Sequence, residues 1–199
     1  MLRIALLVGA LVAAFYGVAT AGAAAQTAAR PAPSGDYRAP PVGLEIENEK
    51  GGRLRIVAVD GLDITYRQPG GQVAVRHTPF FRQCQHQACR VDPSPLESLF
   101  PLALGNTASF ILSRDQMRWQ HSYEVVGAET MPIGTEVYDV WVVAHVEESL
   151  TGRYRSEERY YYAPAVGFIV RVEQYIATGI ENPRNRRDSW YAVAVRRPE

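Results

Sequence analysis

From Gly43 onward, apolar residues alternate with polar ones along most of the chain, and turn-forming residues interrupt this alternation roughly every eight to twelve residues. A period of two is typical of β-strands with one buried face, whereas an amphipathic helix repeats every 3.6 residues. Asp60-Gly61 and Pro69-Gly70-Gly71 separate the first three such segments, and residues of these types favour the positive φ angles of tight hairpins. The sequence therefore predicts antiparallel strands that follow one another along the chain.

The alternating segments number about nine, so we expect a mainly β protein with a single curved antiparallel sheet, either a half-barrel or an open barrel. The segments are LRIVAV, LDITYR, QVAVRHT, TASFILSR, WQHSYEVVGAE, VYDVWVVAHVEE, RYRSEERYYYA, GFIVRVEQYI and SWYAVAVRR. The turn at residues 149–152 bears on register, because Glu148 would face either Arg153 or Arg155 across the hairpin. Either pairing places opposite charges on neighbouring strands.

The segment at residues 137–146 is largely apolar on both faces of its expected strand. Asp139 is the exception, and the two faces carry Tyr138, Val140, Val142 and Ala144 on one side and Val137, Trp141 and Val143 on the other. A strand buried on both sides needs a sheet that curls around something, or a helix packed against its concave side.

One short helix is expected at residues 95–100. The segment Ser94-Pro95-Leu96-Glu97 has the form of a capping box, with Ser94 as N-cap, proline at the first helical position and glutamate three residues on. Pro101 ends the helix, because its ring would clash with the preceding turn. We expect this helix to pack on the concave side of the sheet.

The first 25 residues have the pattern of a secretory signal peptide. Arg3 supplies a positive charge, residues 4–18 are almost wholly apolar, and Ala23-Ala24-Ala25 offers small residues for cleavage. The alternative is an uncleaved anchor, because the uncharged run approaches the length that spans a bilayer. We expect a periplasmic or secreted protein with no membrane span after cleavage, or a protein anchored by this segment if it is not cleaved.

Residues 26–42 are rich in Pro, Ala, Gly and Ser and lack apolar periodicity, so we expect a flexible tether there and a single β domain at residues 43–199. The chain has 21 Lys and Arg residues against 21 Asp and Glu residues, which gives a formal net charge of +0. This balance gives no electrostatic reason to expect a nucleic-acid partner.

The chain has two cysteines, Cys84 and Cys89, in the segment CQHQACR. In a secreted protein such a pair favours a disulfide that closes a small loop and stabilises the fold by about 2 kcal/mol. A zinc site would need His86 and His77 to converge on both sulfurs, and a redox pair would favour the tighter C-x-x-C spacing. We therefore expect a structural disulfide and no bound metal.

The sequence contains none of the common catalytic motifs. It has no G-x-S-x-G elbow, H-E-x-x-H helix, phosphate-binding glycine loop or dinucleotide fingerprint, so we expect no cofactor and no enzymatic activity. His145 and Glu147 are two residues apart on an expected strand and share a face, as an acid–base pair would. Glu157 and Glu158 are adjacent and point to opposite faces, so we expect both in solvent.

Two groups of side chains are candidates for ligand binding. Arg184, Arg186 and Arg187 could hold a phosphate or a lipid head group, or could instead form a solvated loop with nearby acidic residues. Large aromatic side chains on the expected strands either pack the sheet or line a ligand groove on its concave face. The groove candidates are Trp119, Tyr138, Trp141, Tyr160, Tyr161 and Tyr162.

Three segments resemble a loosely defined group of small bacterial cell-envelope proteins of uncharacterised function. They are LFPLALGNTASF (residues 99–110), YEVVGAETMPIGTEVYDVWVV (residues 123–143) and RYYYAPAVGFIVRVE (residues 159–173). The resemblance implies a curved antiparallel half-barrel, similar in shape to the periplasmic lipoprotein carriers, and it implies no catalytic residue. Ala108 departs from the pattern, which usually has an aromatic residue at that position.

These features together predict a non-enzymatic secreted envelope protein whose half-barrel binds an apolar small molecule, a lipid or a partner chain on its concave face. The alternative is a structural or assembly module that docks onto another envelope protein through a strand edge or the proline-rich tether. A hydrolase that uses His145 and Glu147 is a remote alternative.

Overall fold

A computed structural model of the chain describes residues 32–83, 90–114, 116–152, 154–178 and 189–199, and Pro31–Glu199 belong to one compact unit. Several of the sequence predictions lie outside the described residues. These are the signal peptide at residues 1–25, the disulfide between Cys84 and Cys89, and the anion contact of Arg184, Arg186 and Arg187.

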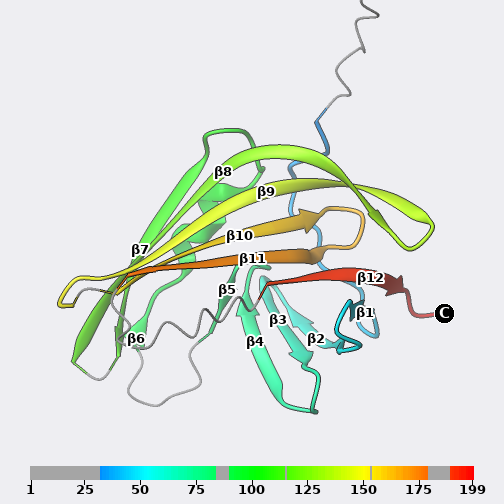
Figure 1. The fold of residues 1–199 in the computed structure, drawn as a ribbon, viewed down its shortest axis with the longest axis horizontal. Helices are drawn as coiled ribbons and strands as arrows, with labels where there is room; N and C mark the ends of the chain where they lie inside the picture. The colour runs from blue at the N-terminus through cyan, green and yellow to red at the C-terminus, as the bar shows by residue number, and fades with distance from the viewer. Residues whose placement is uncertain (1–31, 84–89, 115, 153, 179–188) are drawn as a thin grey trace, which may run out of the picture. The chain divides into compact units, whose positions relative to one another are not determined.

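The described residues form one sheet of twelve strands, which Figure 1 shows as a curled ribbon with the long β8–β9 hairpin arching across it. The strands are β1 (Glu45–Asn48), β2 (Arg53–Asp60), β3 (Asp63–Arg67), β4 (Val73–His77), β5 (Phe81–Arg82), β6 (Arg90–Val91), β7 (Thr107–Arg114), β8 (Met117–Ile133), β9 (Glu136–Ser149), β10 (Arg155–Ala163), β11 (Phe168–Thr178) and β12 (Trp190–Arg196). Their order is β5-β4-β3-β2-β1-β12-β11-β10-β9-β8-β7-β6, with antiparallel pairing throughout. The predicted class, a mainly β protein with one open antiparallel sheet, is confirmed.

The predicted segments correspond to β2, β3, β4 and β7–β12, and the sheet gains β1, β5 and β6 beyond them. The hairpins form where the turn residues indicate, with Gly61, Gly70 and Gly71 at φ values of 56°, 90° and 87°. The three additional strands are too short to show an alternation, because β1 has four residues and β5 and β6 have two each.

The two ends of the strand order meet across the core. The rings of Phe81 in β5 and Phe110 in β7 have centroids 4.9 Å apart, although nine strands lie between β5 and β7 in the sheet order. The ring of Phe80 similarly packs against Tyr160 and Tyr162 of β10 at 6.2 and 5.8 Å. The sheet therefore curves around its core, and we call the face that carries these rings the inner face.

The predicted helix is present as η1, a 3-10 helix over Ser94–Leu99, but the predicted capping box is wrong. The N-cap is Pro93 and no side chain caps the helix; instead, the Asp92 carboxylate accepts a hydrogen bond from the backbone N–H of Ser94 at 3.0 Å. Leu96 and Leu99 are buried, and η1 packs against β7 and β8. The helix thus contributes apolar side chains to the core.

Strand β9 is buried on both faces over its central part, as predicted, since Val140, Trp141, Val142 and Val143 are all buried. Val137 contradicts the prediction, because it is 63% exposed beside the turn that joins β8 to β9. On the other side of β9, Arg155 pairs with Glu148 in the register, and their side chains lie 3.6 Å apart. This is one of the two predicted pairings.

Part of the segment predicted as a tether, residues 26–42, makes hydrogen bonds with the rest of the unit. The Trp141 indole N–H donates to the carbonyl of Ser34 at 3.1 Å, and the backbone N–H of Leu102 donates to the carbonyl of Gly35 at 2.6 Å. The backbone N–H of Arg38 donates to the Tyr162 hydroxyl at 3.2 Å. Residues 34–38 are therefore held against the sheet.

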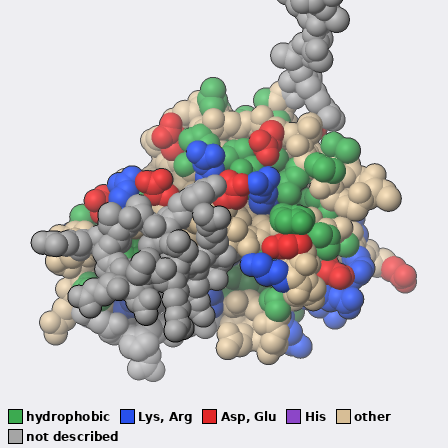
Figure 2. All heavy atoms as spheres, viewed as in Figure 1, with side chains coloured by type: hydrophobic (Ala, Val, Ile, Leu, Met, Phe, Trp, Pro, Cys, Tyr) green, Lys and Arg blue, Asp and Glu red, His purple; other side chains and the backbone are tan. Residues whose placement is uncertain are grey.

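The outer face carries mixed charges. Among the side chains that Figure 2 colours, acidic and basic ones are interspersed over the face in view. Contacts such as Arg155–Glu157 at 2.9 Å and Arg196–Glu47 at 2.8 Å are examples of outer-face pairs, which contribute little to stability because solvent screens them. Among the described residues, no helix is long and apolar enough to cross a membrane.

Candidate functional site

A row of polar side chains crosses the inner faces of β8 to β11. The strand register places Tyr123 opposite His145, His145 opposite Glu158, and Glu158 opposite Gln174. Because side chains of one face recur at every second residue, His121 and Glu147 also face inward and lie directly opposite each other. The period of two that builds the sheet thus gathers six polar groups on neighbouring strands.

Glu158 is the centre of this row. Its Oε2 lies 3.1 Å from Nδ1 of His145 and accepts a short hydrogen bond from the Tyr160 hydroxyl, while its Oε1 accepts one from the Gln174 amide at 2.9 Å. Burial raises the pKa of Glu158, but the contacts with His145 and Tyr160 outweigh it, and the pKa stays below its usual value. Glu158 is therefore a carboxylate, held by groups from β9, β10 and β11.

The two histidines are joined directly. Nδ1 of His121 lies 3.0 Å from Nε2 of His145, and the two rings are nearly parallel. The carboxylate of Glu158 only accepts hydrogen bonds, so the facing Nδ1 of His145 carries a hydrogen. In the neutral pair Nε2 of His145 then accepts, and Nδ1 of His121 donates to it.

His121 and Glu147 meet at the next position along the row. Burial, with the neighbouring His145, lowers the pKa of His121 to about 3, so this ring is neutral at ordinary pH. Burial raises the pKa of Glu147 above its usual range. Nε2 of His121 is 4.0 Å from Oε1 of Glu147, beyond hydrogen-bonding distance.

Arg76 of β4 enters the same space from the far end of the sheet order. Its Nη1 donates to the carbonyls of Pro79 and Phe80 at 3.2 and 3.0 Å. Its guanidinium carbon lies 5.9 Å from the ring centroid of Tyr66 and 5.8 Å from that of Tyr160, which are cation–π distances. These contacts hold the Arg76 charge between the two halves of the sheet.

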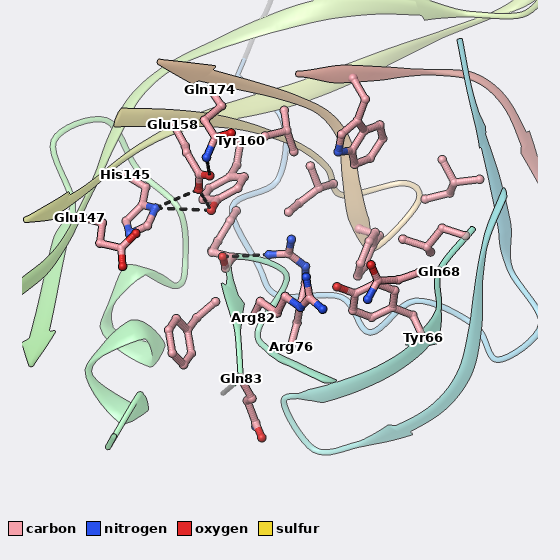
Figure 3. A pocket seen from close by; sticks show the side chains of 18 of the residues that line it. Tyr66, Gln68, Arg76, Arg82, Gln83, His145, Glu147, Glu158, Tyr160 and Gln174 are labelled. Carbon is pink, nitrogen blue, oxygen red and sulfur yellow. Dashed lines mark hydrogen bonds and ion pairs between the residues drawn. The ribbon is translucent and has the colours of Figure 1, made fainter. Parts of the chain in front are cut away.

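These groups line a cavity of about 760 Å³ on the inner face. Figure 3 shows His145, Glu147 and Glu158 on one side of it, Tyr66 and Gln68 on the other, and Arg76 between them. The polar side consists of groups from β7 to β10: Arg114, His121, Tyr123, His145, Glu147 and Glu158. The opposite wall is mainly apolar, with Ile46, Leu54, Phe168, Ile169, Val172 and Trp190 from β1, β2, β11 and β12.

The structure places the predicted groove residues in different surroundings. Tyr160 lines the cavity. Trp119 is buried against Tyr154, with ring centroids 5.2 Å apart, while Trp141 and Tyr162 contact the backbone of residues 34–38. The hydroxyls of the other two donate to carboxylates, that of Tyr138 to Glu136 and that of Tyr161 to Glu173 at 2.9 Å. Within the described residues, Tyr160 is the member of the predicted set that lines the cavity.

His145 and Glu147 share a face and line the cavity, but the nearest carboxylate to His145 is Glu158, and Glu147 is the one near His121. The prediction that Glu158 lies in solvent is wrong, since its side chain is 19% exposed, whereas that of Glu157 is 48% exposed. Sequence reasoning missed His121, Tyr123 and Glu158. Each lies an even number of residues from a buried side chain on the same strand, and therefore on the same face. Glu158, for example, is two residues from Tyr160 and four from Tyr162.

In the described part of the chain, no group of three or more His, Cys, Asp or Glu residues is arranged to hold a metal ion. The carboxylates and imidazoles of the row are instead engaged with one another through hydrogen bonds. What the arrangement offers chemically is a mixed set of donors and acceptors beside an apolar wall.

No family model matches the chain, and no curated protein matches it. Solved structures with a similar arrangement include the hypothetical lipoprotein YmcC from Escherichia coli, at 15% identity and a TM-score of 0.46, with 72% of this chain and 84% of that chain covered. A candidate lipoprotein from Parabacteroides distasonis has 13% identity and a TM-score of 0.42, covering 84% and 100%. A candidate exported protein with a YmcC-like fold from Bacteroides fragilis has 14% identity and a TM-score of 0.37, covering 81% and 99%.

Proposed function

We propose that this protein is a secreted, non-enzymatic binding protein of the cell envelope that takes up a small amphiphilic molecule in its inner cavity. The observation that carries the proposal is the division of the cavity wall into an apolar side and a hydrogen-bonding side. Small-molecule sites typically have ~300–1,000 Å³, mainly apolar walls and a few placed polar groups. The cavity of about 760 Å³ has a volume in this range and combines an apolar wall with a polar side that is at least as extensive.

The apolar wall supplies the binding free energy in this proposal. Trp190 and Leu54 are only partly buried, and Val172 is 7% exposed, so they present apolar surface to the cavity. Covering such surface with a hydrocarbon chain contributes roughly 25 cal/mol per Å². An aliphatic chain is thus the part of the ligand that this wall suits.

The polar side supports binding more than catalysis. Both ring nitrogens of His145 are engaged, one with His121 and one with Glu158, so His145 has no free nitrogen for a substrate. The pair His145–Glu147 would need His145 to face Glu147, but the closest contact of Glu147 with a histidine is with His121 at 4.0 Å. The hydrolase alternative therefore gains no support from this geometry.

The assembly-module alternative also has no specific observation in its favour. The edge strands β5 and β6 have two residues each, which offers little backbone for addition of a partner strand. Residues 34–38, within the predicted tether, are engaged with the sheet.

The proposal is tested with four molecules that each carry one ten-carbon chain, used below their micelle concentrations: 1-decanoylglycerol, decanoate, decyltrimethylammonium and methyl decanoate. Protein unfolded and refolded to strip bound molecules is titrated with each by isothermal titration calorimetry. We expect saturable binding of at least one, with the negative heat-capacity change that accompanies apolar burial. Absence of binding for all four overturns the proposal.

A variant that fills the cavity locates the site. Leu54→Arg places a long charged side chain on the apolar wall and should abolish binding. Val193→Arg is the matched control, because Val193 is 37% exposed and does not line the cavity. If Leu54→Arg remains folded by circular dichroism and binds as well as Val193→Arg, the ligand lies elsewhere.

A further inference from the structure

Among the described residues that line the cavity, four buried polar atoms have no hydrogen-bond partner: Nε2 of Gln68, Nε2 of His121, the hydroxyl of Tyr123 and Oε1 of Gln174. His121 and Tyr123 form a neighbouring pair among these, and the two residues are 5% and 2% exposed. Both side chains come from the inner face of β8, two residues apart, and both line the cavity. Burial of a polar atom without a partner costs free energy, so each atom is suited to a partner that enters the cavity.

The hydrogen-bonded chain that starts at Glu158 sets the character of His121. When His145 gives its single ring hydrogen to Glu158, its Nε2 accepts from Nδ1 of His121, and the remaining nitrogen of His121 then carries a lone pair. Nε2 of His121 is therefore a hydrogen-bond acceptor on the cavity wall. It lies at the end of a chain anchored on a carboxylate, which fixes its tautomer.

Tyr123 supplies the complementary group. Its ring is stacked on His145, with centroids 4.3 Å apart, and on Phe110 at 6.0 Å, so its direction is set by packing. Burial raises the pKa of Tyr123 well above its usual value, which keeps the hydroxyl protonated and able to donate. One acceptor and one donor therefore stand together on β8.

The charges around the cavity disfavour an ionic partner at this point. Glu147 lies 4.0 Å from Nε2 of His121 and, with Glu158 on the same side of the cavity, would repel an anion. Arg76, Arg82 and Arg114 also line the cavity and would repel a cation. A hydroxyl group is neutral and both donates and accepts, which matches His121 and Tyr123 together.

We infer that the polar side of the cavity recognises a neutral, hydroxyl-bearing head group, with Nε2 of His121 accepting from it and the Tyr123 hydroxyl donating to it. This inference rests on the proposed function, since it names the head group of the amphiphile whose chain lies on the apolar wall. It assigns specificity to two residues and affinity to the wall formed by β1, β2, β11 and β12.

The head-group series of amphiphiles tests the inference. With the intact protein, 1-decanoylglycerol should bind roughly ten-fold or more tightly than methyl decanoate, which has the same acyl chain and no hydroxyl. It should also bind more tightly than decanoate and decyltrimethylammonium. Equal binding of all four, or a preference for either ion, overturns the inference and leaves the proposed function standing, whereas no binding overturns both.

Tyr123→Phe is the sharpest variant, because the lost hydroxyl has no partner in the described protein and its removal should not destabilise the fold. This variant should bind 1-decanoylglycerol about five- to ten-fold more weakly than the intact protein does, and its affinity for methyl decanoate should be unchanged. Tyr161→Phe is the matched control, since the Tyr161 hydroxyl donates to Glu173 and does not line the cavity. Unaltered affinity of Tyr123→Phe for 1-decanoylglycerol contradicts the assignment.

A second pair of variants examines His121. His121→Phe keeps a flat ring but removes the acceptor, and should reduce the preference for 1-decanoylglycerol over methyl decanoate. His121→Gln restores a polar acceptor near the position of Nε2 and should recover part of that preference. If the two variants show the same ratio of affinities as the intact protein, His121 is not part of the recognition.

Discussion

Nδ1 of His121 lies 3.0 Å from Nε2 of His145, so two histidines on neighbouring strands share one hydrogen inside the sheet. His145 in turn faces Glu158 at 3.1 Å, which extends the contact to a third strand. A buried imidazole without partners would be costly, and here each ring is held by the next group in the chain. The stability of β8, β9 and β10 should therefore depend on the carboxylate at the end.

Glu158→Gln should lower the free energy of unfolding by about 1–3 kcal/mol. The amide that replaces the carboxylate brings an NH₂ group, and this group must face one of the donors from His145, Tyr160 or Gln174. Urea unfolding followed by circular dichroism measures the change.

The adjacent Glu157→Gln is the control for this prediction. Glu157 lies on the opposite face, is 48% exposed and pairs with Arg155, so its replacement should change the free energy of unfolding by less than about 0.5 kcal/mol. Equal losses in the two variants would mean that the inner-face contacts of Glu158 contribute nothing specific.

The contrast between Glu157 and Glu158 also shows how far the sequence predicts this fold. Alternation and turn residues act locally, so they predict the hairpins and the longer strands. The pairing of β1 with β12 joins residues such as Ile46 and Val195, and its register shifts between Glu47 and Asn48, which no local pattern records. Short edge strands such as β5, with two residues, carry no periodic signal at all.

For the candidate site too, the sequence predicts the local features but not the contacts between strands. That His145 and Glu147 share a face follows from their spacing alone. That His145 meets Glu158 depends on which residues oppose each other in β9 and β10, and this register is set by packing along both strands. Glu158 is an even number of residues from Tyr160 and Tyr162, so it shares their face. The sequence predicts that this face is the inner one only once those tyrosines are known to face the core.

Acid should destabilise the protein partly through His121. Its pKa is about 3 in the folded protein against 6.5 for a free imidazole, so between these values the unfolded chain binds more protons. The free energy of unfolding therefore falls as pH falls through this window, and the contribution is fully present above pH 6.5. The raised pKa of Glu147 has the opposite effect on stability. In the pH range where the folded protein holds this proton and the unfolded chain does not, the free energy of unfolding rises as pH falls.

The variant His121→Phe isolates this contribution because Glu147 remains in both proteins. Between pH 7 and pH 4 the intact protein should lose more stability than His121→Phe, by an amount on the order of a few kcal/mol. Urea midpoints across this range provide the comparison. Parallel pH profiles would show that His121 is protonated in the folded protein as easily as in the unfolded chain.

Gly167→Ala should destabilise the protein by more than backbone strain alone. Gly167 has φ +74°, and a Cβ there would lie 2.8 Å from the Arg38 carbonyl oxygen and 2.8 Å from the backbone nitrogen of Pro40. Gly70→Ala is the control, since Gly70 has φ +90° and nothing within 4 Å of its Cβ position. In both variants, backbone strain should lower the free energy of unfolding by about 1–2 kcal/mol. Gly167→Ala should lose more than this, and its thermal midpoint should therefore be lower than that of Gly70→Ala. Equal midpoints would show that residues 38–40 can move away from the turn without cost.

Phe80→Ala should be among the most damaging single changes, because Phe80 connects the β5 end of the curved sheet with β10. Its side chain is 1% exposed and its ring packs against Phe100, Tyr160 and Tyr162 at centroid distances of 5.9, 6.2 and 5.8 Å. Removing a buried ring of this size typically costs about 3–5 kcal/mol, since the surrounding rings cannot fully close the cavity. Leu104→Ala, at a residue that is 71% exposed, should cost less than about 0.5 kcal/mol in the same urea titration. A loss below about 1 kcal/mol for Phe80→Ala would mean that the contacts between β10 and the segment before β5 do not hold the sheet closed around its core.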